Sequence, residues 1–426
     1  MDGTEEKSPA AASYPPGPGM PHENQAKLWI DRPSTLLESC HRLHGDAFTL
    51  KLGQFGTIVV LSDPEQLRPI LAAPREGVEC RPFNEAYRYV MGDHALFLQD
   101  GDRHKRLKAL IGPLMHEPSG KVYGAKAARA ARAAIPGWIE AGLMRPRPEI
   151  NAIALTALMT LLLGDNSPHV APVLEMVRAR AWGDLRSWKP WTGLSQLRPR
   201  IFALLDDEIA KRRSAPADDL LDWMIGARGS GGDALSDAEI KDQVMMLMIT
   251  AVDASATAGA WAAWRLSTEP EVQDRLREEV AERGSDGPYL DAVCKEVLRL
   301  HTVVPTVSGR RVSKDADLAG GRVPAGATLA PCQYLAHRRA DVFEDPLAFR
   351  PERFLGRSWP AHEYFPFGGG QRACAGSTLA PMFVRTLLAA LSEIRLFDPK
   401  PERARAQRLG TMMAPQSDLE IKATAR

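Results

Sequence analysis

The chain has 426 residues, of which 44% are hydrophobic and 25% are charged, and its formal net charge is +1. These fractions are ordinary for a soluble globular protein, and they exclude a disordered chain, a collagen and a polytopic membrane protein. Because 54 basic residues balance 53 acidic ones, the overall charge argues against a nucleic-acid binder. Length alone suggests two or three domains and a core large enough to enclose a bulky ligand.

Residues 1–20 are expected to form a flexible tail. They are polar or small, and they end in a run of proline and glycine over 15–19 that fits neither helix nor strand. The start of the chain has no basic segment followed by an apolar one, so we expect neither a signal peptide nor an N-terminal membrane anchor. No later shift in composition marks a second domain. We therefore predict a tail over 1–20 and a single large domain over 21–426.

The first elements in chain order are a β-hairpin over 47–52 and 57–61 and a helix from Pro64 to about 72, with Asp63 as its N-cap. A long loop is expected over 74–100, where no clear period is present. Apolar residues then recur at helical spacing in six segments. These predicted helices cover 102–116, 121–141, 150–163, 171–187, 197–213 and 217–227.

A capping box formed by Ser236 and Glu239 predicts the start of a long helix that runs to about Leu266. Its segment 244–264 is long enough to cross a bilayer. However, Asp253 lies at the middle, where a charge costs about 2.5–3.5 kcal/mol on insertion. We therefore expect a buried helix, in which the Asp253 carboxylate needs a compensating partner or role.

The last third of the chain is expected to mix helices, short strands and coil. Two helices are predicted over 269–283 and 288–300, and short strands over 301–335. A proline-rich coil over 340–370 follows, then a helix over about 375–395 and a β-like end.

Five cysteines are present, an odd number, and no two have CxxC spacing. This spacing supports neither a zinc ribbon nor a dithiol redox motif, and the small number fits a reducing cytosol. The count and spacing leave open whether one of the five is a functional thiolate. The five are Cys40, Cys80, Cys294, Cys332 and Cys374.

Cys374 stands out because residues 365–376 read FPFGGGQRACAG. Three successive glycines allow a tight turn and a close approach to a flat ligand. We expect a helix to begin near Gly376, and both a helix N-terminus and the cation Arg372 would lower the pKa of the Cys374 thiol. A lone thiolate with no second ligand nearby suits a metal held mostly by another group, such as the nitrogens of a porphyrin.

The pattern Phe367-x-x-Gly370-x-Arg372-x-Cys374-x-Gly376 resembles the haem-binding signature of the cytochrome P450 superfamily, whose haem iron is held by a cysteine thiolate. Three further segments at the expected distances resemble the same family, and together the motifs cover about residues 20 to 426. These segments are Glu296-Val297-Leu298-Arg299, which matches ExxR, 349–354 with Arg353, and 102–108 with His104 and Lys108.

The resemblance implies a mainly α fold with small β-sheets (α+β). In this fold a long central helix lies over a haem b, and the cysteine loop lies on the proximal side. Residues 21–426 would then be one haem-binding catalytic domain with Cys374 as the iron ligand. Glu296, Arg299 and Arg353 would form a structural network that holds the cysteine loop. The other expected haem contacts are Phe367, Gly376, His104, Lys108, Arg372 and Arg310, the last preferred to its neighbour Arg311.

The long helix departs from the family where it should face the haem. The family usually has an acid followed by a threonine, and this pair relays protons during oxygen activation. By match, Asp253 takes the acid position and would be the remaining proton conduit, Ala254 replaces the threonine, and Ser255 follows. Three explanations stay open: Ser255, Thr250 or ordered water replaces the hydroxyl, the substrate supplies it, or the reaction does not need ordinary oxygen activation.

The resemblance also locates a substrate pocket lined by apolar and aromatic residues, which fits a lipophilic substrate. No cluster of cations is visible there to bind a phosphate or a carboxylate. The residues preferred as substrate contacts are Phe97, Leu98, Ala251, Ala254, Val304, Val307 and Met412. Further candidates are Tyr87, Tyr89, Trp182, Trp188, Trp191, Val303 and Met413.

No flavin or nicotinamide domain is fused to the haem domain, so electrons from NAD(P)H are expected to arrive through an external reductase and a ferredoxin or flavodoxin. A basic cluster is expected to dock that partner. Its members are Arg103, Lys105, Arg106, Lys108 and Lys121.

The sequence therefore predicts a cytoplasmic oxidoreductase, a haem- and iron-dependent monooxygenase of paired-donor type. It would be a monomer by family default, without nucleic acid or membrane anchor. It would use O2 to hydroxylate or epoxidise a small apolar molecule of terpenoid, steroid, fatty acyl or polyketide type in secondary metabolism. Ala254 keeps an alternative open: an isomerase, a dehydratase or a peroxide-dependent enzyme that needs no redox partner. A noncatalytic haem- or ligand-binding module is the third reading, and the retained Asp253 weighs against it.

Overall fold

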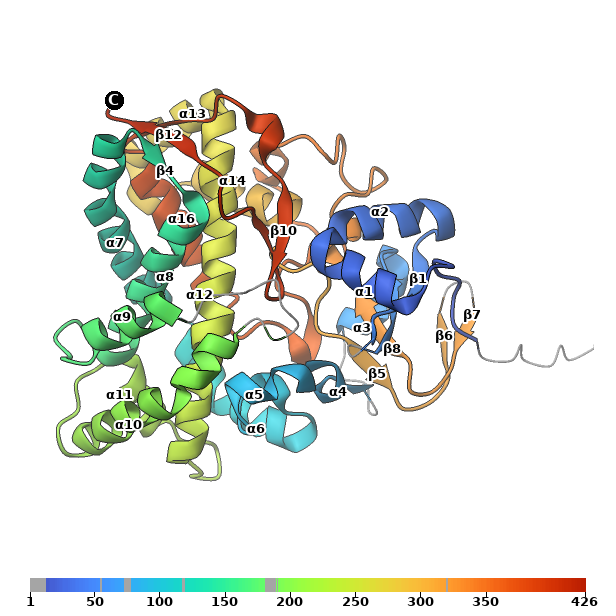
Figure 1. The fold of residues 1–426 in the computed structure, drawn as a ribbon, viewed down its shortest axis with the longest axis horizontal. Helices are drawn as coiled ribbons and strands as arrows, with labels where there is room; N and C mark the ends of the chain where they lie inside the picture. The colour runs from blue at the N-terminus through green and yellow to red at the C-terminus, as the bar shows by residue number, and fades with distance from the viewer. Residues whose placement is uncertain are drawn as a thin grey trace, which may run out of the picture.

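The computed structural model describes residues 13–53, 56–72, 78–116, 119–180, 189, 191–318 and 321–426. Most of the described chain is helical, and the strands are short, as expected (Figure 1). The helices gather in one part of the molecule, and the largest sheet lies beside them with α1 (His22–Asp31) and α2 (Pro33–His44).

The centre of the helical part is α12 (Asp237–Thr268), which packs against α8 (Pro146–Leu163) and α16 (Leu379–Leu391). A third helix, α7 (Ser119–Ala141), packs against both α8 and α16. These four helices contain much of the apolar core. The remaining α-helices of this part are α6 (Gly101–Ile111), α9 (Val170–Arg180), α10 (Thr192–Ser214), α11 (Leu220–Gly226), α13 (Pro270–Arg283) and α14 (Pro288–Leu300).

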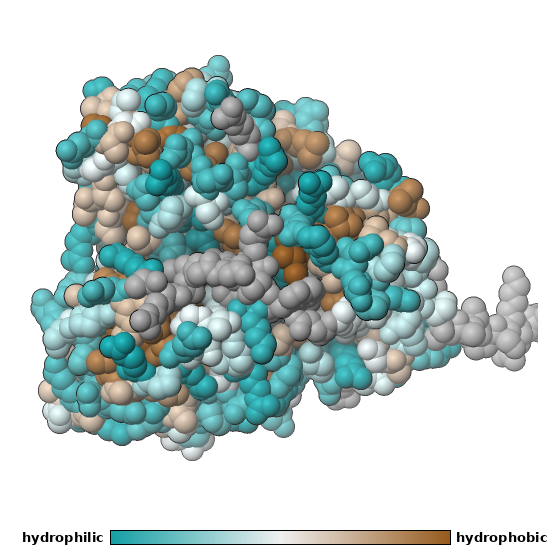
Figure 2. All heavy atoms as spheres, viewed as in Figure 1, coloured by the Kyte–Doolittle hydropathy of each residue, from teal (hydrophilic) through white to brown (hydrophobic). Residues whose placement is uncertain are grey.

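The predicted capping box starts α12. The Glu239 backbone N–H donates to Ser236 Oγ at 3.2 Å, and the Ser236 N–H donates to Glu239 Oε2 at 2.9 Å. The helix is long and apolar enough to span a membrane, but 83% of its most apolar window is buried in the protein. The prediction of a buried core helix is therefore confirmed. Figure 2 shows that one face of the molecule carries mostly polar residues, with small separate apolar spots between them.

The largest sheet has the strand order β1-β2-β8-β5-β3. The predicted hairpin is confirmed as an antiparallel pair in which Ala47 faces Leu61, and β2 pairs with β8 in parallel. Small sheets β4-β12-β9, β10-β11 and β6-β7 complete the β structure. The strands are β1 (Ala47–Lys51), β2 (Thr57–Leu61), β3 (Val78–Glu79), β4 (Leu143–Met144), β5 (Arg310–Val312), β6 (Ala316–Leu318), β7 (Gly321–Val323), β8 (Thr328–Pro331), β9 (Arg395–Phe397), β10 (Ala406–Leu409), β11 (Met412–Pro415) and β12 (Ile421–Thr424).

Two expectations about local structure are wrong. The region expected as a loop over 74–100 contains, in its described part, short helical turns, because single turns carry no readable period. The helix expected from about 375 begins only at Leu379. The helical turns of the first region are α4 (Arg81–Asn84), η2 (Glu85–Tyr87), α5 (Arg88–Met91) and η3 (Leu96–Leu98). Short elements elsewhere are α3 (Pro64–Ala72), η4 (Gly112–Met115), η5 (Gly284–Asp286), α15 (Gln333–Ala336), η6 (Pro351–Phe354), η7 (Gly370–Arg372) and η8 (Pro401–Arg403).

Part of the segment predicted as a tail lies against β1. The Thr49 N–H donates to the Pro16 carbonyl at 2.9 Å, and Thr49 Oγ1 donates to the Pro15 carbonyl at 2.7 Å. A Cβ on Gly17 would lie 2.1 Å from the Thr49 carbonyl oxygen, so this approach requires glycine. The division into a tail over 1–20 and one domain over 21–426 stays a prediction.

Candidate active site

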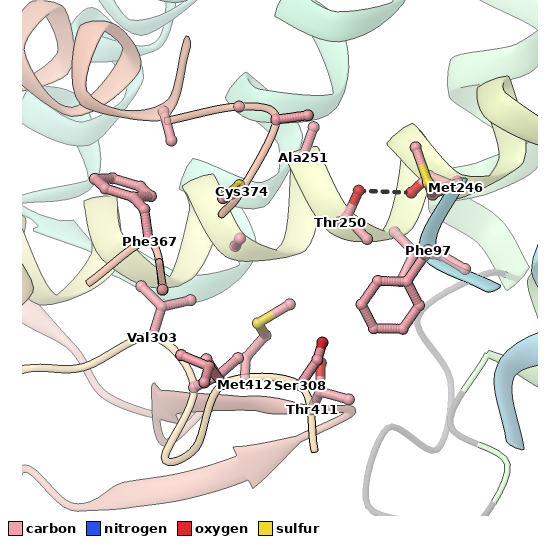
Figure 3. Close-up of a pocket in the computed structure, with 18 of the residues that line it drawn as sticks. Phe97, Met246, Thr250, Ala251, Val303, Ser308, Phe367, Cys374, Thr411 and Met412 are labelled. Carbon is pink, nitrogen blue, oxygen red and sulfur yellow. Dashed lines mark hydrogen bonds between the residues drawn. The ribbon is translucent and has the colours of Figure 1, made fainter. Parts of the chain in front are cut away.

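A cavity lies between α12 and the loop that carries Cys374 (Figure 3). Its other walls come from the segment 303–308, from the turn between β10 and β11, and from the short helical turns around Phe97. Figure 3 shows Thr411 and Met412 across the cavity from Thr250 and Ala251. The cavity therefore brings together segments from the N-terminal, central and C-terminal parts of the chain.

One face of α12 supplies small side chains to this cavity. Ala251, Ala254, Ser255 and Ala258 line it, at the i, i+3, i+4 and i+7 spacing that places residues on one helix face. Thr250 also lines the cavity, and its Oγ1 donates to the Met246 carbonyl at 2.9 Å (Figure 3). Ala254 and Ser255 are thus located where the sequence analysis expected them.

Asp253 does not line the cavity, although it was expected to conduct protons there. The residue lies two positions from both Ala251 and Ser255, which places it on the other side of the helix. Its side chain has no exposed surface, and Oδ1 accepts a hydrogen bond from Nη2 of Arg147 on α8. Burial raises the pKa of the Asp253 carboxyl, and Arg147 opposes that shift. Arg147 is a functional candidate that the sequence analysis missed.

On the cavity side, Ser255 lies next to Tyr123 of α7. Burial raises the pKa of the Tyr123 phenol, and the Ser255 hydroxyl opposes that shift. The Tyr123 hydroxyl is buried, and the pair does not reach hydrogen-bond geometry. Ser255 is thus a cavity-lining hydroxyl directly after position 254 in the sequence, and its O–H can rotate.

The Cys374 loop is a tight turn that directs its sulfur into the cavity. The Cys374 N–H donates to the Phe367 carbonyl at 2.9 Å, and Gly370 has a φ of +63°. A Cβ on Gly370 would lie 2.6 Å from the carbonyl oxygen of Leu71. Among the five cysteines Cys374 alone is exposed, and the surface that it exposes faces the cavity, which it lines together with Phe367 and Gly376; the surrounding protein still buries the thiol. Gly369 and Gly370 thus allow the loop to approach α3 closely, and Gly368 of the same run lines the cavity. The close approach of the glycines to a flat ligand stays a prediction.

The expected cause of a low thiol pKa is wrong. Burial raises the pKa of Cys374, while the Gly376 N–H and the Lys108 ammonium lower it. Arg372 instead pairs with Asp100. The helix begins too far along the chain, at Leu379, to place its N-terminus at the sulfur. A bound metal ion would lower this thiol pKa further, because metals deprotonate coordinating thiols.

The four residues expected at the haem propionates differ in how they are placed. His104, Lys108 and Arg372 line the cavity near the cysteine loop. Lys108 Nζ donates to the carbonyls of Gln371 at 2.6 Å and Ala373 at 3.1 Å. Arg310 points inward and donates to the Gly369 carbonyl at 3.0 Å, whereas Arg311 is exposed. Successive side chains of β5 point to opposite faces, so Arg310 is buried where Arg311 is exposed. This agrees with the choice of Arg310 as the expected propionate contact.

Two buried nitrogen atoms at this edge fit the acidic rim of a haem. Nδ1 of His104 and Nη1 of Arg310 have no hydrogen-bond partner among the described residues. Burial and the neighbouring Lys108 lower the pKa of His104 to about 4, so its imidazole is neutral at pH 7. A buried donor without a partner is costly, and a propionate oxygen would satisfy it.

The predicted network behind the loop is present. Glu296 accepts hydrogen bonds from Arg299 Nε at 2.7 Å, Arg299 Nη2 at 2.9 Å and Arg353 Nε at 3.1 Å. Glu296 and Arg299 have no exposed side-chain surface, and Arg353 is 8% exposed. Arg299 also donates to the carbonyls of His337 and Pro346, both at 2.7 Å. The network ties α14 to the coil that precedes the cysteine loop.

Most of the preferred substrate contacts line the cavity, but Leu98 is buried elsewhere. Trp182 and Trp188 lie outside the described residues. Tyr89 and Met413 do not line the cavity, whereas the lining candidates are Phe97, Ala251, Ala254, Val304, Val307 and Met412, with Tyr87, Trp191 and Val303. The sequence analysis missed Trp29, Thr411 and Arg408, which come from distant elements with no shared motif.

Only part of the basic cluster predicted around α6 is open surface. Arg106 donates to Asp233 at 2.8 Å and to Glu239 at 2.7 Å, and Lys108 faces the cysteine loop. Lys105 is 62% exposed beside Asp102. The cluster is therefore weaker than the sequence suggested.

A family model described as cytochrome P450 matches residues 186–422. A Mycobacterium tuberculosis protein provisionally named cytochrome P450 135B1 is 30% identical over 437 residues, covering 98% of this chain and 92% of the relative. Another protein from the same organism, provisionally named cytochrome P450 135A1, is 29% identical over 386 residues, which cover 87% of this chain and 85% of the relative.

Two solved structures share the fold. Cyanobacterial CYP120A1 bound to retinoic acid has a TM-score of 0.84 at 22% identity, over 98% of this chain and 100% of that one. The haem domain of cytochrome P450DA has a TM-score of 0.78 at 20% identity, over 97% of each chain.

Proposed function

This chain belongs to the cytochrome P450 family of haem monooxygenases, and from that premise we propose that it hydroxylates or epoxidises a lipophilic small molecule with electrons from a separate protein. The observation that carries the proposal is that Cys374 and the small side chains of α12, such as Ala251 and Ala254, line the same apolar cavity. Cys374 would ligate the iron, and Ala251 and Ala254 would leave room above it for dioxygen and substrate. A terpenoid, steroid, fatty acyl or polyketide-like substrate fits these walls.

The residues at the cavity fit a haem. His104 lines the cavity and Arg310 lies behind the cysteine loop, and each offers a buried nitrogen for a propionate. Lys108 adds positive charge to the cavity lining, whereas the charge of Arg372 is partly balanced by Asp100. When bound, the haem would supply the iron at which dioxygen is activated. The protein would supply the thiolate, the apolar walls that exclude water, and hydroxyl groups that hold protons at Ser255 Oγ and Thr250 Oγ1.

We propose that a separate ferredoxin or flavodoxin donates the electrons, in the cytoplasm, because part of the basic surface predicted around α6 is exposed. Lys105 and Lys121 are exposed, and Lys108 of the same helix as Lys105 contacts the cysteine loop, so we propose that an acidic partner docks beside that loop. Raising the ionic strength should therefore weaken partner affinity, and Lys105→Glu should weaken it at low salt. The same change at Lys27 of α1 is the matched control. Equal affinity of the redox partner for the parent, Lys105→Glu and Lys27→Glu proteins would contradict this docking site.

The experiment that tests the cofactor and its ligand is the CO difference spectrum of the dithionite-reduced protein. The parent protein should show the red-shifted Soret band of a thiolate-ligated haem, and Cys374→Ser should lose it. Cys40→Ala, which removes a buried thiol in α2, should keep it. A purified parent protein without haem, or an unchanged band in Cys374→Ser, would overturn the proposal.

Ala254 favours one alternative function, an isomerase, dehydratase or peroxide-dependent enzyme that needs no redox partner. The position lines the cavity and carries no hydroxyl. Turnover assays distinguish the two. The monooxygenase should form product with a ferredoxin, its reductase and NAD(P)H under O2. Product with peroxide alone, and none with the ferredoxin system, would support the alternative instead.

A further inference from the structure

Arg408 brings a buried positive charge to the cavity. It lies on β10, only 7% of its surface is exposed, and it is one of the residues that line the cavity. Its Nε donates to the Gly410 carbonyl at 3.0 Å, which fixes the guanidinium beside the β10–β11 turn. This turn carries Thr411 and Met412 into the cavity (Figure 3).

Aromatic side chains surround this guanidinium. It lies over the ring of Trp29 at 5.4 Å. Burial raises the pKa of the neighbouring Tyr87 phenol, and the charge and side-chain hydrogen bonding of Arg408 oppose that shift. Trp191 packs against Gly410 so closely that a Cβ there would lie 2.5 Å from the ring. Trp29, Tyr87 and Trp191 all line the cavity. Arg408 is thus held in an apolar environment, where its interaction with an anion is stronger than in water.

The charges that the described residues bring to the cavity all have one sign. No Asp or Glu of the described residues lines it, and its cations are Lys108, Arg372 and Arg408, with the neutral His104. Lys108 and Arg372 belong to the cysteine-loop edge, where the haem propionates are expected. Arg408 lies on another element and contacts Trp29 of α1. This part of the cavity therefore favours a second anionic group, one that does not belong to the cofactor.

We infer that Arg408 binds the carboxylate of an otherwise apolar substrate. The inference rests on the proposed function, because it names the substrate class of the same cavity. Guanidinium and carboxylate form two parallel charge-assisted hydrogen bonds, which fix orientation as well as affinity. With its carboxylate held at Arg408, the apolar body of the substrate would extend along Met412 and Val304 toward the α12 face at Ala251 and Ala254.

The test compares carboxylic acids with the corresponding alcohols in binding to the haem-loaded protein. The probes are dodecanoic, retinoic and cholanic acid, each with its primary alcohol, and affinity is measured by calorimetry and by the shift of the Soret band. At least one acid should bind about tenfold to a hundredfold more tightly than its alcohol. Arg408→Met should remove that preference by weakening the acid far more than its alcohol, and Arg408→Lys should retain part of it.

Arg405→Met is the matched control, because Arg405 precedes the same hairpin but is exposed. It should leave the preference for the acid unchanged. A structural role of Arg408 would instead lower thermal stability and weaken acids and alcohols equally, which would overturn the inference. So would a panel in which no acid is preferred, or a preference that survives in Arg408→Met.

The readouts keep this inference separate from the proposed function. Acid binding that depends on Arg408 without product formation would contradict the monooxygenase and support the carboxylate site. Product formation from neutral substrates only, with equal rates in Arg408→Met, would support the monooxygenase and overturn the carboxylate site.

Discussion

Arg147 and Asp253 form an ion pair between α8 and α12 in which neither side chain has more than 5% of its surface exposed. The two residues are 106 positions apart in the sequence. The pair lies on the side of α12 opposite the small residues that line the cavity. Its placement explains how the central helix of an apolar core tolerates a carboxylate at its middle.

Removing Arg147 should destabilise the fold in a pH-dependent manner. Arg147→Met leaves the Asp253 carboxylate buried without its partner, which costs about 3–5 kcal/mol of unfolding free energy at pH 8. Burial raises the Asp253 pKa in the folded state, so the folded variant keeps a proton that the unfolded chain releases above about pH 4. The loss should therefore be smaller at pH 5 than at pH 8.

Urea unfolding of the parent and the variant at both pH values measures this difference. The double variant Arg147→Met/Asp253→Asn is the control, because it removes both charges and should recover much of the stability. An equal loss at the two pH values would contradict the role assigned to the carboxylate.

Replacing the Arg353 side chain should destabilise the protein far more than replacing that of Arg350, although the two residues lie in or next to the same short helical turn, η6. Arg353→Met leaves Glu296 with one guanidinium fewer in a buried network, at a cost of about 3–5 kcal/mol. The Arg350 side chain is 45% exposed and pairs with Asp345, so Arg350→Met should cost less than about 1 kcal/mol. Thermal or denaturant unfolding compares the two. Equal costs would show that the network does not hold the loop.

Gly370→Ala should damage the cysteine loop. Its φ of +63° disfavours an L side chain, and the new Cβ would meet the Leu71 carbonyl oxygen at 2.6 Å. We expect reduced haem content and a lower melting temperature. Gly137→Ala in α7, where nothing lies within 4 Å, should instead stabilise by about 0.5–1 kcal/mol. Full haem content in Gly370→Ala would mean that the turn is not required.

Ala254→Thr should raise the fraction of reductant electrons that end in product. The substitution restores a hydroxyl on the cavity face of α12, where ordered water or Ser255 would otherwise hold the protons. The ratio of product formed to NAD(P)H consumed measures this coupling. Ala258→Ser adds a hydroxyl one turn away and should leave the ratio unchanged. An unchanged or lower ratio in Ala254→Thr would favour proton delivery by the substrate.

Local features of the fold could be predicted where short-range chemistry decides them. The hairpin at 47–61 follows from β-branched residues around glycine, and the start of α12 follows from the reciprocal hydrogen bonds of Ser236 and Glu239. The Cys374 loop was recognised because its residues must meet one flat ligand, which constrains their types at fixed spacing. The short turns over 81–98 were missed because a single turn shows no period.

The remaining site residues depend on tertiary contacts that no local pattern records. Arg147 meets Asp253, and Arg408 meets Trp29, only because α8 and β10 pack where they do. The orientation of Asp253 could have been predicted from the sequence, since its position relative to Ala251 and Ala254 already places it off the cavity face. Leu98 was misplaced because an apolar residue in a loop can face either the core or a cavity.

Because α12 is one continuous helix from its capping box to the cavity, the number of residues before Thr250 determines which side chains face the cavity. Each residue turns the helix by about 100°, so one residue inserted between Ser236 and Thr250 would rotate everything that follows by that angle. Ala254 would leave the cavity wall, and Asp253 would lose its alignment with Arg147. The length of this stretch is thus constrained even where its individual side chains touch neither cavity nor partner.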